Sequence, residues 1–174
     1  ALVINALLNG QANLENLSEA NDTQLMKRLL NTPDEVIDVE DAGTVMRFLT
    51  AYCAVRVQRK TMTGTPRMQK RPIRELVDAL RQLGANIRYG EHDGYPPLHL
   101  EGFEGQQTDR LTLRGDVSSQ FISGLMMVAP VLPRGLTITL TGTIGSRPYL
   151  EMTARLMRHF GAAVDMTGDR ISIL

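Results

Sequence analysis

Three stretches of the chain are apolar on nearly every helical face. They are residues 1–8 (ALVINALL), 43–55 (GTVMRFLTAYCAV) and 120–129 (QFISGLMMVA). Their Ala, Leu and Met content favours helix over strand, and Pro130 and Pro133 end the third stretch. Because a helix that is apolar all round is a buried helix, the pattern predicts three buried helices.

A predicted strand follows each buried helix, and in two cases an amphipathic helix follows the strand. The strands are residues 11–17, 58–63 and 136–141. The amphipathic helices are residues 72–83 and 148–160, in which apolar residues recur at i, i+3, i+4 and i+7. This stripe consists of Ile73, Leu76, Val77, Leu80 and Leu83 in the first helix, and of Tyr149, Met152, Leu156, Met157 and Phe160 in the second. A proline (Pro72, Pro148) is expected at the first helical position, and a glycine (Gly84, Gly161) just after the last.

Strand pairs are predicted to close the pattern: residues 86–89 with 98–101, and 163–166 with 170–174. The order of elements repeats, and RPIRE at Arg71 aligns with RPYLE at Arg147. The chain is therefore expected to be one domain over residues 1–174, with a truncated first unit at 1–41 and further units at 42–116 and 117–174. Pseudo-threefold packing of these units would place the buried helices in the centre and the sheets outside, which inverts the usual α/β layering.

Composition excludes several classes of protein. The chain has 43% hydrophobic and 22% charged residues, with 19 Lys+Arg against 19 Asp+Glu. The apolar content argues against disorder, and zero net charge gives no general attraction to nucleic acid or to an anionic membrane. No apolar run reaches the ~18–20 residues of a membrane span, and the apolar start has no signal-peptide pattern. The single cysteine, Cys53, suits a reducing cytoplasm, and the start inside an apolar segment leads us to expect a piece of a longer protein.

Four polar segments interrupt the apolar runs at or near predicted helix N-termini. They are DAGT (41–44), RMQKR (67–71), SSQ (118–120) and SRPY (146–149). Parallel buried helices bring their N-termini together, where free N–H groups and helix dipoles attract anions. Gly43 allows a ligand to approach the backbone closely. Together the segments predict a cleft for a small polyanion.

Each segment also has a plain structural explanation. The serines can cap a helix, DAGT can be a turn, the basic run can be a solvated surface, and Tyr149 can belong to the core. Arg47 differs, because an unpaired charge in an apolar helix is costly and requires a protein or ligand partner. The histidines lack metal-ligand spacing, and Cys53 in a buried helix is expected to be inert. No metal or cofactor motif is recognisable.

As a set, the motifs resemble the 5-enolpyruvylshikimate-3-phosphate (EPSP) synthase family. The resemblance is carried by TGTPRMQKRPIRELVDALRQLGA (63–85), YPPLHLEG (95–102), GDVSSQFISGLMM (115–127) and GSRPYLEMTARLMRHFG (145–161). It covers essentially the whole chain and matches the N-terminal lobe of a two-lobed enzyme. The resemblance implies an inside-out α/β prism of repeated units, in agreement with the pattern above.

The resemblance also implies an activity: transfer of the enolpyruvyl group of phosphoenolpyruvate to the 5-hydroxyl of shikimate 3-phosphate, with release of phosphate, in aromatic amino acid synthesis. It implies no cofactor. It places shikimate 3-phosphate on Ser118, Ser119, Gln120, Ser146 and Tyr149. It places phosphoenolpyruvate on Gly43, Thr44, Arg67 and Gln120, where a guanidinium fork suits a phosphate or carboxylate.

Two positions depart from the family pattern. Asp41 stands where asparagine is common, and its carboxylate would repel an anion unless it is protonated or paired with Arg47. Phe48 stands where proline is common, which is expected to alter the pocket wall and its tolerance of glyphosate. The resemblance further implies a lysine-bearing segment ahead of Ala1 and a second lobe with the acidic residues for proton transfer. The isolated chain is therefore expected to contain no catalytic residue and to be inactive.

Two alternatives stay open. The sister family of UDP-N-acetylglucosamine enolpyruvyl transferases shares the fold but uses a cysteine on a mobile loop, whereas Cys53 lies in an apolar stretch. A non-enzymatic anion-binding domain would use the same helix N-termini without catalysis. A ligand screen of shikimate 3-phosphate against a nucleotide sugar would separate the enzyme families.

Overall fold

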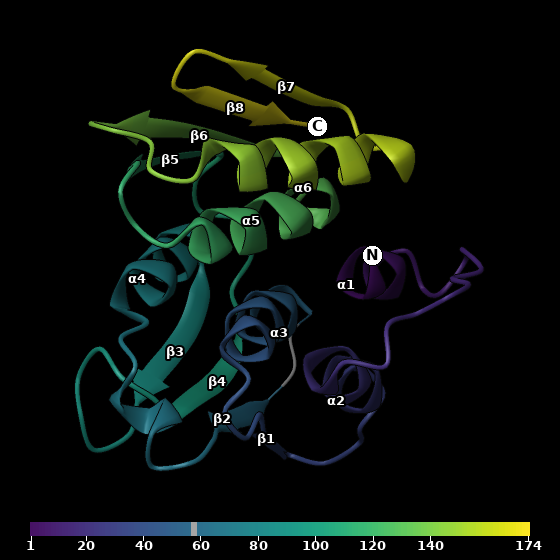
Figure 1. The fold of residues 1–174 in the computed structure, drawn as a ribbon. Coiled ribbons are helices and arrows are strands. Elements are labelled where there is room, and N and C mark those ends of the chain that lie inside the picture. The colour runs from purple at the N-terminus through teal and green to yellow at the C-terminus, as the bar shows by residue number, and fades with distance from the viewer. Residues whose placement is uncertain (57–58) are drawn as a thin grey trace.

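Two four-stranded sheets enclose the apolar helices of this computed structural model, which describes residues 1–56 and 59–174 (Figure 1). The first sheet has the order β1-β2-β4-β3 and the second β5-β6-β8-β7. The strands are β1 (Val36–Asp38), β2 (Lys60–Thr63), β3 (Ala85–Tyr89), β4 (Leu98–Phe103), β5 (Arg110–Arg114), β6 (Leu136–Thr141), β7 (Val164–Thr167) and β8 (Arg170–Ile173). The helices are α1 (Leu2–Leu7), α2 (Asn21–Leu30), α3 (Gly43–Val55), α4 (Arg74–Leu83), α5 (Ser119–Val128) and α6 (Arg147–His159), with 3-10 turns η1 (Met68–Lys70) and η2 (Ala129–Val131).

The two sheets share one topology. In each, the first two strands are parallel and the remaining pairs are antiparallel. A buried helix connects the parallel strands, and an amphipathic helix then leads into a hairpin. The observed unit therefore begins one strand before the buried helix. The sequence pattern missed β1 and β5, because β1 has only three residues and β5 has a charged residue at each end.

The three predicted buried helices are present as α1, α3 and α5, and they contact one another. Leu49 in α3 and Leu125 in α5 have no exposed surface. The sheets lie outside this helical centre, as Figure 1 shows for α3 and α5. Strands β6 and β8 each alternate buried apolar residues with more exposed residues, so that one face of the sheet covers the helices. The mixed helix-and-sheet fold with inverted layers is confirmed.

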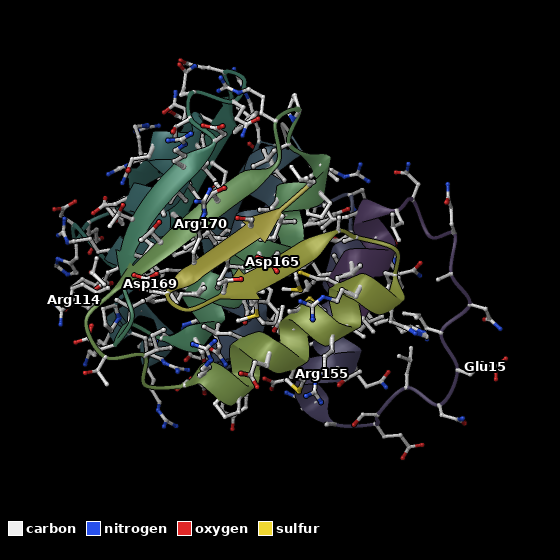
Figure 2. The ribbon with its side chains drawn as sticks, turned by 90° about the horizontal axis from the view of Figure 1, so that it is seen from above. Glu15, Arg114, Arg155, Asp165, Asp169 and Arg170 are labelled. Carbon is white, nitrogen blue, oxygen red and sulfur yellow. The ribbon has the colours of Figure 1, made fainter. Side chains whose placement is uncertain are left out.

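The first unit has no sheet of its own among the described residues. The strand predicted at residues 11–17 is wrong: this segment is an irregular loop, and Glu15 projects from it at the edge of the molecule (Figure 2). Residues 31–35 alone separate the unpredicted helix α2 from β1, which leaves no room for a strand pair. Because a strand needs a neighbour for its backbone hydrogen bonds, the local pattern at 11–17 is not sufficient.

Most other predicted elements are confirmed, with two corrections. The strand predicted over residues 58–63 is observed at Lys60–Thr63. Residue 58, the first of the predicted strand, lies outside the described residues. Helix α4 buries its predicted stripe and ends at Gly84 with φ 114°, as expected, but it begins at Arg74, two residues after Pro72.

The buried face of α6 also differs from the predicted stripe. Leu150, Thr153, Ala154 and Met157 face the core. Tyr149 and Met152, by contrast, are 62% and 59% exposed. The small residues allow α5 to approach closely, and the Thr153 and Ser123 hydroxyls lie 3.0 Å apart between the two helices. Of the predicted stripe, Met157 is confirmed as buried and Leu156 and Phe160 as half-buried against the core, whereas the assignment of Tyr149 and Met152 to the buried face is wrong.

Candidate functional site

The polar segments gather where four parallel strands end. DAGT follows β1, the basic run follows β2, SSQ follows β5 and SRPY follows β6. Because β1 pairs in parallel with β2, and β5 with β6, the carboxyl ends of each pair lie side by side. Val39 N–H donates to the Thr63 carbonyl at 2.9 Å, and Gly115 N–H donates to the Thr141 carbonyl at 2.7 Å, which extends both pairs into the turns.

The N-termini of α3 and α5 meet at this edge. Gln120 Nε2 donates a hydrogen bond to Thr44 Oγ1 at 2.8 Å. Both residues hold the second position of their helices, and they lie 76 residues apart in sequence. The same separation relates Arg71 to Arg147 in the sequence repeat. Equivalent positions of two units are thus in contact, and the positive ends of two helix dipoles converge.

Arg47 lies one turn into α3 and is buried, with 7% of its surface exposed. Its guanidinium lies over the Phe121 ring of α5, 5.5 Å from the ring centroid. Arg47 Nε and Nη1 have no hydrogen-bond partner within residues 1–56 and 59–174. Burial and the neighbouring Arg71 lower the pKa of Arg47 to about 10, so it remains a cation at neutral pH. A buried, unpaired cation is costly unless an anion compensates it.

Arg71 is the residue that the sequence interpretation missed as a ligand candidate. The nearest atoms to a Cβ built on Gly43 would belong to the guanidiniums of Arg71 and Arg47. Both cations therefore lie against the first residue of α3, and no side chain fits between them and the backbone. Arg67, the residue indicated by the resemblance, lies at the start of η1. Both arginines are exposed, but only the Arg71 guanidinium is among the atoms nearest to Gly43. No local signal distinguishes Arg71 from Arg67, because both belong to one basic run.

The repeat itself would have argued for a structural role of Arg71. Its counterpart Arg147 forms an ion pair with Glu151 at 3.1 Å and donates to the Gly168 carbonyl at 2.8 Å. For Arg71 no such ion pair occurs among the residues that the structure describes. The two units therefore use the same arginine position differently.

The SSQ segment occupies the start of α5. Ser118 is the N-cap residue, yet its hydroxyl makes no capping hydrogen bond, and Phe121 N–H donates instead to the Ser118 carbonyl at 2.9 Å. Ser118, Ser119 and Gln120 are all half-buried. The plain explanation of Ser118 as a helix cap is therefore not observed, and the segment is partly accessible to solvent.

The SRPY segment lies at the start of α6. Ser146 is the N-cap residue of α6, again without a capping hydrogen bond from its side chain. Tyr149 is 62% exposed, which rules out the explanation that it belongs to the core. An exposed aromatic ring with a free hydroxyl beside a helix N-terminus is available to a ligand.

Asp41 is not paired with Arg47, which removes one of the two arrangements considered from the sequence. Its Oδ1 accepts a hydrogen bond from Thr65 Oγ1 at 2.6 Å. Asp41 thus contacts the turn that leads into the basic run.

Phe48, the other residue that departs from the family pattern, lines a cavity of about 180 Å³ together with Ala1, Asp22, Thr44 and Met127.

Cys53 has no reactive character. It is 2% exposed within α3, and burial raises the pKa of its thiol to about 12. A thiol of this kind is not a nucleophile at neutral pH. Within the described ranges no group of three His, Cys, Asp or Glu side chains is placed to hold a metal ion, and no helix has the length and hydrophobicity to cross a membrane.

This chain is similar in sequence and in fold to known proteins. A family profile for EPSP synthase (3-phosphoshikimate 1-carboxyvinyltransferase) matches residues 3–174. The 3-phosphoshikimate 1-carboxyvinyltransferase of Bacteroides fragilis is 52% identical over 170 residues, which is 98% of this chain and 41% of that protein. The corresponding protein of Sodalis glossinidius is 40% identical over an alignment 190 positions long, which covers 94% of this chain and 43% of that protein.

A solved structure of EPSP synthase from Acinetobacter baumannii matches the fold with a TM-score of 0.68 at 27% identity. The match covers 82% of this chain and 31% of that one. The chain thus spans about 41% of the length of its Bacteroides relative. Because the family profile covers nearly every residue, the chain belongs to the EPSP synthase family.

Proposed function

We propose that the complete protein transfers the enolpyruvyl group of phosphoenolpyruvate to the 5-hydroxyl of shikimate 3-phosphate and releases phosphate. The observation that carries this proposal is the buried guanidinium of Arg47, which lies beside Arg71 at the start of α3. Its Nε and Nη1 have no hydrogen-bond partner in the part of the chain that the structure describes. Two cations and two helix N-termini suit a small ligand with several negative charges. Membership of the EPSP synthase family supports the choice of substrates.

The residues of this chain would bind and orient both substrates. Phosphoenolpyruvate would lie against Gly43 and Thr44, held by Arg47 and Arg71, with Gln120 near both ligands and Arg67 at the rim. Shikimate 3-phosphate would take hydrogen bonds from Ser118, Ser119, Gln120, Ser146 and Tyr149. Placing the two reactants side by side converts a bimolecular step into an effectively intramolecular one. Neutralising their negative charges also reduces their mutual repulsion.

A second lobe would supply the groups that move protons, because the residues assigned here to the substrates are cations, hydroxyls and amides, and the nearby carboxylate of Asp41 is bonded to Thr65. Closure of that lobe would also exclude water. We propose a cytoplasmic location for the complete protein, supported by the single, unpaired cysteine of this chain.

The test is phosphate release by the complete protein with phosphoenolpyruvate and shikimate 3-phosphate, and separately with UDP-N-acetylglucosamine as acceptor. The Arg47→Met variant keeps the length of the side chain and removes its charge, so it should lower kcat/KM for phosphoenolpyruvate by about 100-fold. Arg155→Met, at an exposed arginine of α6 (Figure 2), is the matched control and should keep the activity. Activity with the nucleotide sugar alone, or no effect of Arg47→Met, would contradict the proposal.

A further inference from the structure

The turn before α3 and the turn before the basic run are joined by a chain of hydrogen bonds. Thr65 Oγ1 donates to Asp41 Oδ1 at 2.6 Å and accepts from Met68 N–H at 3.3 Å. Met68 in turn accepts a bond from Arg71 N–H through its carbonyl at 2.9 Å. The Asp41 carboxylate is thereby connected, through one hydroxyl and one turn of 3-10 helix, to the backbone of Arg71.

Two guanidinium groups near this connection, those of Arg47 and Arg71, repel each other. Arg47 extends from α3 and Arg71 follows η1, and both guanidiniums lie against Gly43. Their like charges favour separation of the two turns when no anion lies between them. A backbone bond from Thr65 N–H to the Glu40 carbonyl, 3.1 Å long, also holds the turns together, and Gln69 N–H of η1 donates to the Thr65 carbonyl at 3.0 Å. The Thr65 hydroxyl adds a direct side-chain connection from Asp41 to the first residue of η1.

The side-chain bond is not a requirement of the repeated fold. Counting 76 residues along the repeat, the position equivalent to Asp41 is Val117, whose side chain cannot accept a hydrogen bond. There the two turns are joined through the backbone, where Gly145 N–H donates to the Gly115 carbonyl at 3.2 Å. The unit that carries two cations therefore has a polar connection that the other unit lacks.

We propose that Asp41 is a positioning residue, which acts through the Thr65 hydroxyl to hold Arg71 at the distance from Arg47 and Gly43 that an anion requires. The inference rests on the proposed function, because it deepens the role of the same anion site. It assigns Asp41 no contact with the substrate. The carboxylate keeps its negative charge, and the two cations at Gly43 exceed that charge at the anion site.

The test is a double-mutant cycle in the complete protein. Thr65→Val removes the hydroxyl with little change of volume, and it should raise the KM for phosphoenolpyruvate roughly fivefold while the KM for shikimate 3-phosphate stays within about twofold. Thr65→Ser restores the hydroxyl and should restore the KM. In an Asp41→Ala background, Thr65→Val should have a clearly smaller effect, because the bond to Asp41 is already absent and only the longer bond from Met68 N–H remains to be lost. Thr112→Val, at an exposed threonine of β5, is the matched control.

Binding of phosphoenolpyruvate by ligand-observed NMR provides a second readout that needs no turnover, and the same pattern of affinities is expected. The inference is overturned if Thr65→Val leaves phosphoenolpyruvate binding unchanged, if it weakens the binding of both substrates equally, or if its effect is as large in the Asp41→Ala background as in the unmodified protein. Failure of the proposed function is a different result: the unmodified complete protein would then release no phosphate, while the binding cycle would still decide the role of Asp41.

Discussion

At the scale of single residues, Arg47 shows how a sequence anomaly becomes a site. An arginine in an apolar helix required a partner, and the structure places it under α5 with two of its nitrogens unpaired in the described chain. The sequence could indicate that Arg47 is unusual, because the energetic cost of a charge in an apolar helix can be judged from the neighbouring residues alone. It could not indicate Arg71 as the neighbour, because that depends on how η1 lies against α3.

The first prediction separates the three arginines near this site. In the complete protein, Arg71→Ala should lower kcat/KM for phosphoenolpyruvate by about 100-fold, or ~2.7 kcal/mol, because it removes one of the two cations at Gly43. Arg74→Ala should change it less than about threefold, because Arg74 pairs with Asp93 at 2.7 Å on the surface.

Arg67→Ala in the same assay decides between the residue indicated by the resemblance and the residue indicated by the geometry. We expect a smaller loss for Arg67→Ala than for Arg71→Ala. Equal losses of kcat/KM at Arg67, Arg71 and Arg74 would mean that these arginines attract the substrate through their summed positive charge and that none of them binds it specifically.

At the scale of elements, α4 and α6 occupy equivalent places in the two units but obey the sequence pattern differently. In α4 the apolar stripe is the buried face. In α6 the close contact with α5 selects Thr153 and Ala154, and two large apolar side chains remain outside. Periodicity identifies a helix, but the neighbour decides which face is buried when small residues compete with large ones.

The second prediction concerns the glycines that follow these two helices. Gly84 has φ 114°, and a Cβ there would collide with the Gly105 carbonyl. Gly84→Ala should therefore lower the free energy of unfolding by about 2–3 kcal/mol, from backbone strain plus the collision. The measurement is denaturant unfolding followed by circular dichroism.

Gly161→Ala is the matched control for that prediction. Gly161 has φ 92° with open space around its missing Cβ, so only the strain of about 1 kcal/mol applies. Equal losses of unfolding free energy at both positions would mean that the collision at Gly84 is relieved by movement of the chain around Gly105.

At the scale of the whole molecule, the described chain forms a continuous apolar core in which α1, α3 and α5 meet and two sheets cover them. The groups gathered at the carboxyl ends of the parallel strands occupy one edge of this body. A site at an edge is open to water, and open sites bind weakly and catalyse poorly.

The third prediction follows for a polypeptide of residues 1–174. It should fold, bind shikimate 3-phosphate with a dissociation constant of about 1 mM, and release no phosphate from phosphoenolpyruvate, because one wall of a cleft cannot exclude water or move protons. Amide NMR shifts during titration should be confined to residues near 43–47, 71, 118–120 and 146–149. Measurable turnover by this polypeptide would contradict the assignment of proton transfer to another part of the protein.

The sequence by itself determined the buried helices α3 and α5, the hairpins, the repeat and the polar segments at the helix starts. These features depend on residues that are near one another in the chain: apolar runs, Pro and Gly positions, and the 3.6- and 2-residue periods. The site residues found in this way are the ones whose motifs lie directly at a helix N-terminus.

The tertiary structure decided the remaining features. Residues 11–17 have no strand partner, and the contact with α5 determines which face of α6 is buried. The fold also places Arg71 beside Arg47 and brings Asp41 within hydrogen-bond distance of Thr65. Each of these depends on a neighbour that is distant in sequence, and the choice among local alternatives is made by packing and electrostatic interactions between elements. For that reason the sequence could specify the kind of site, while the pairing of its charges emerged only from the fold.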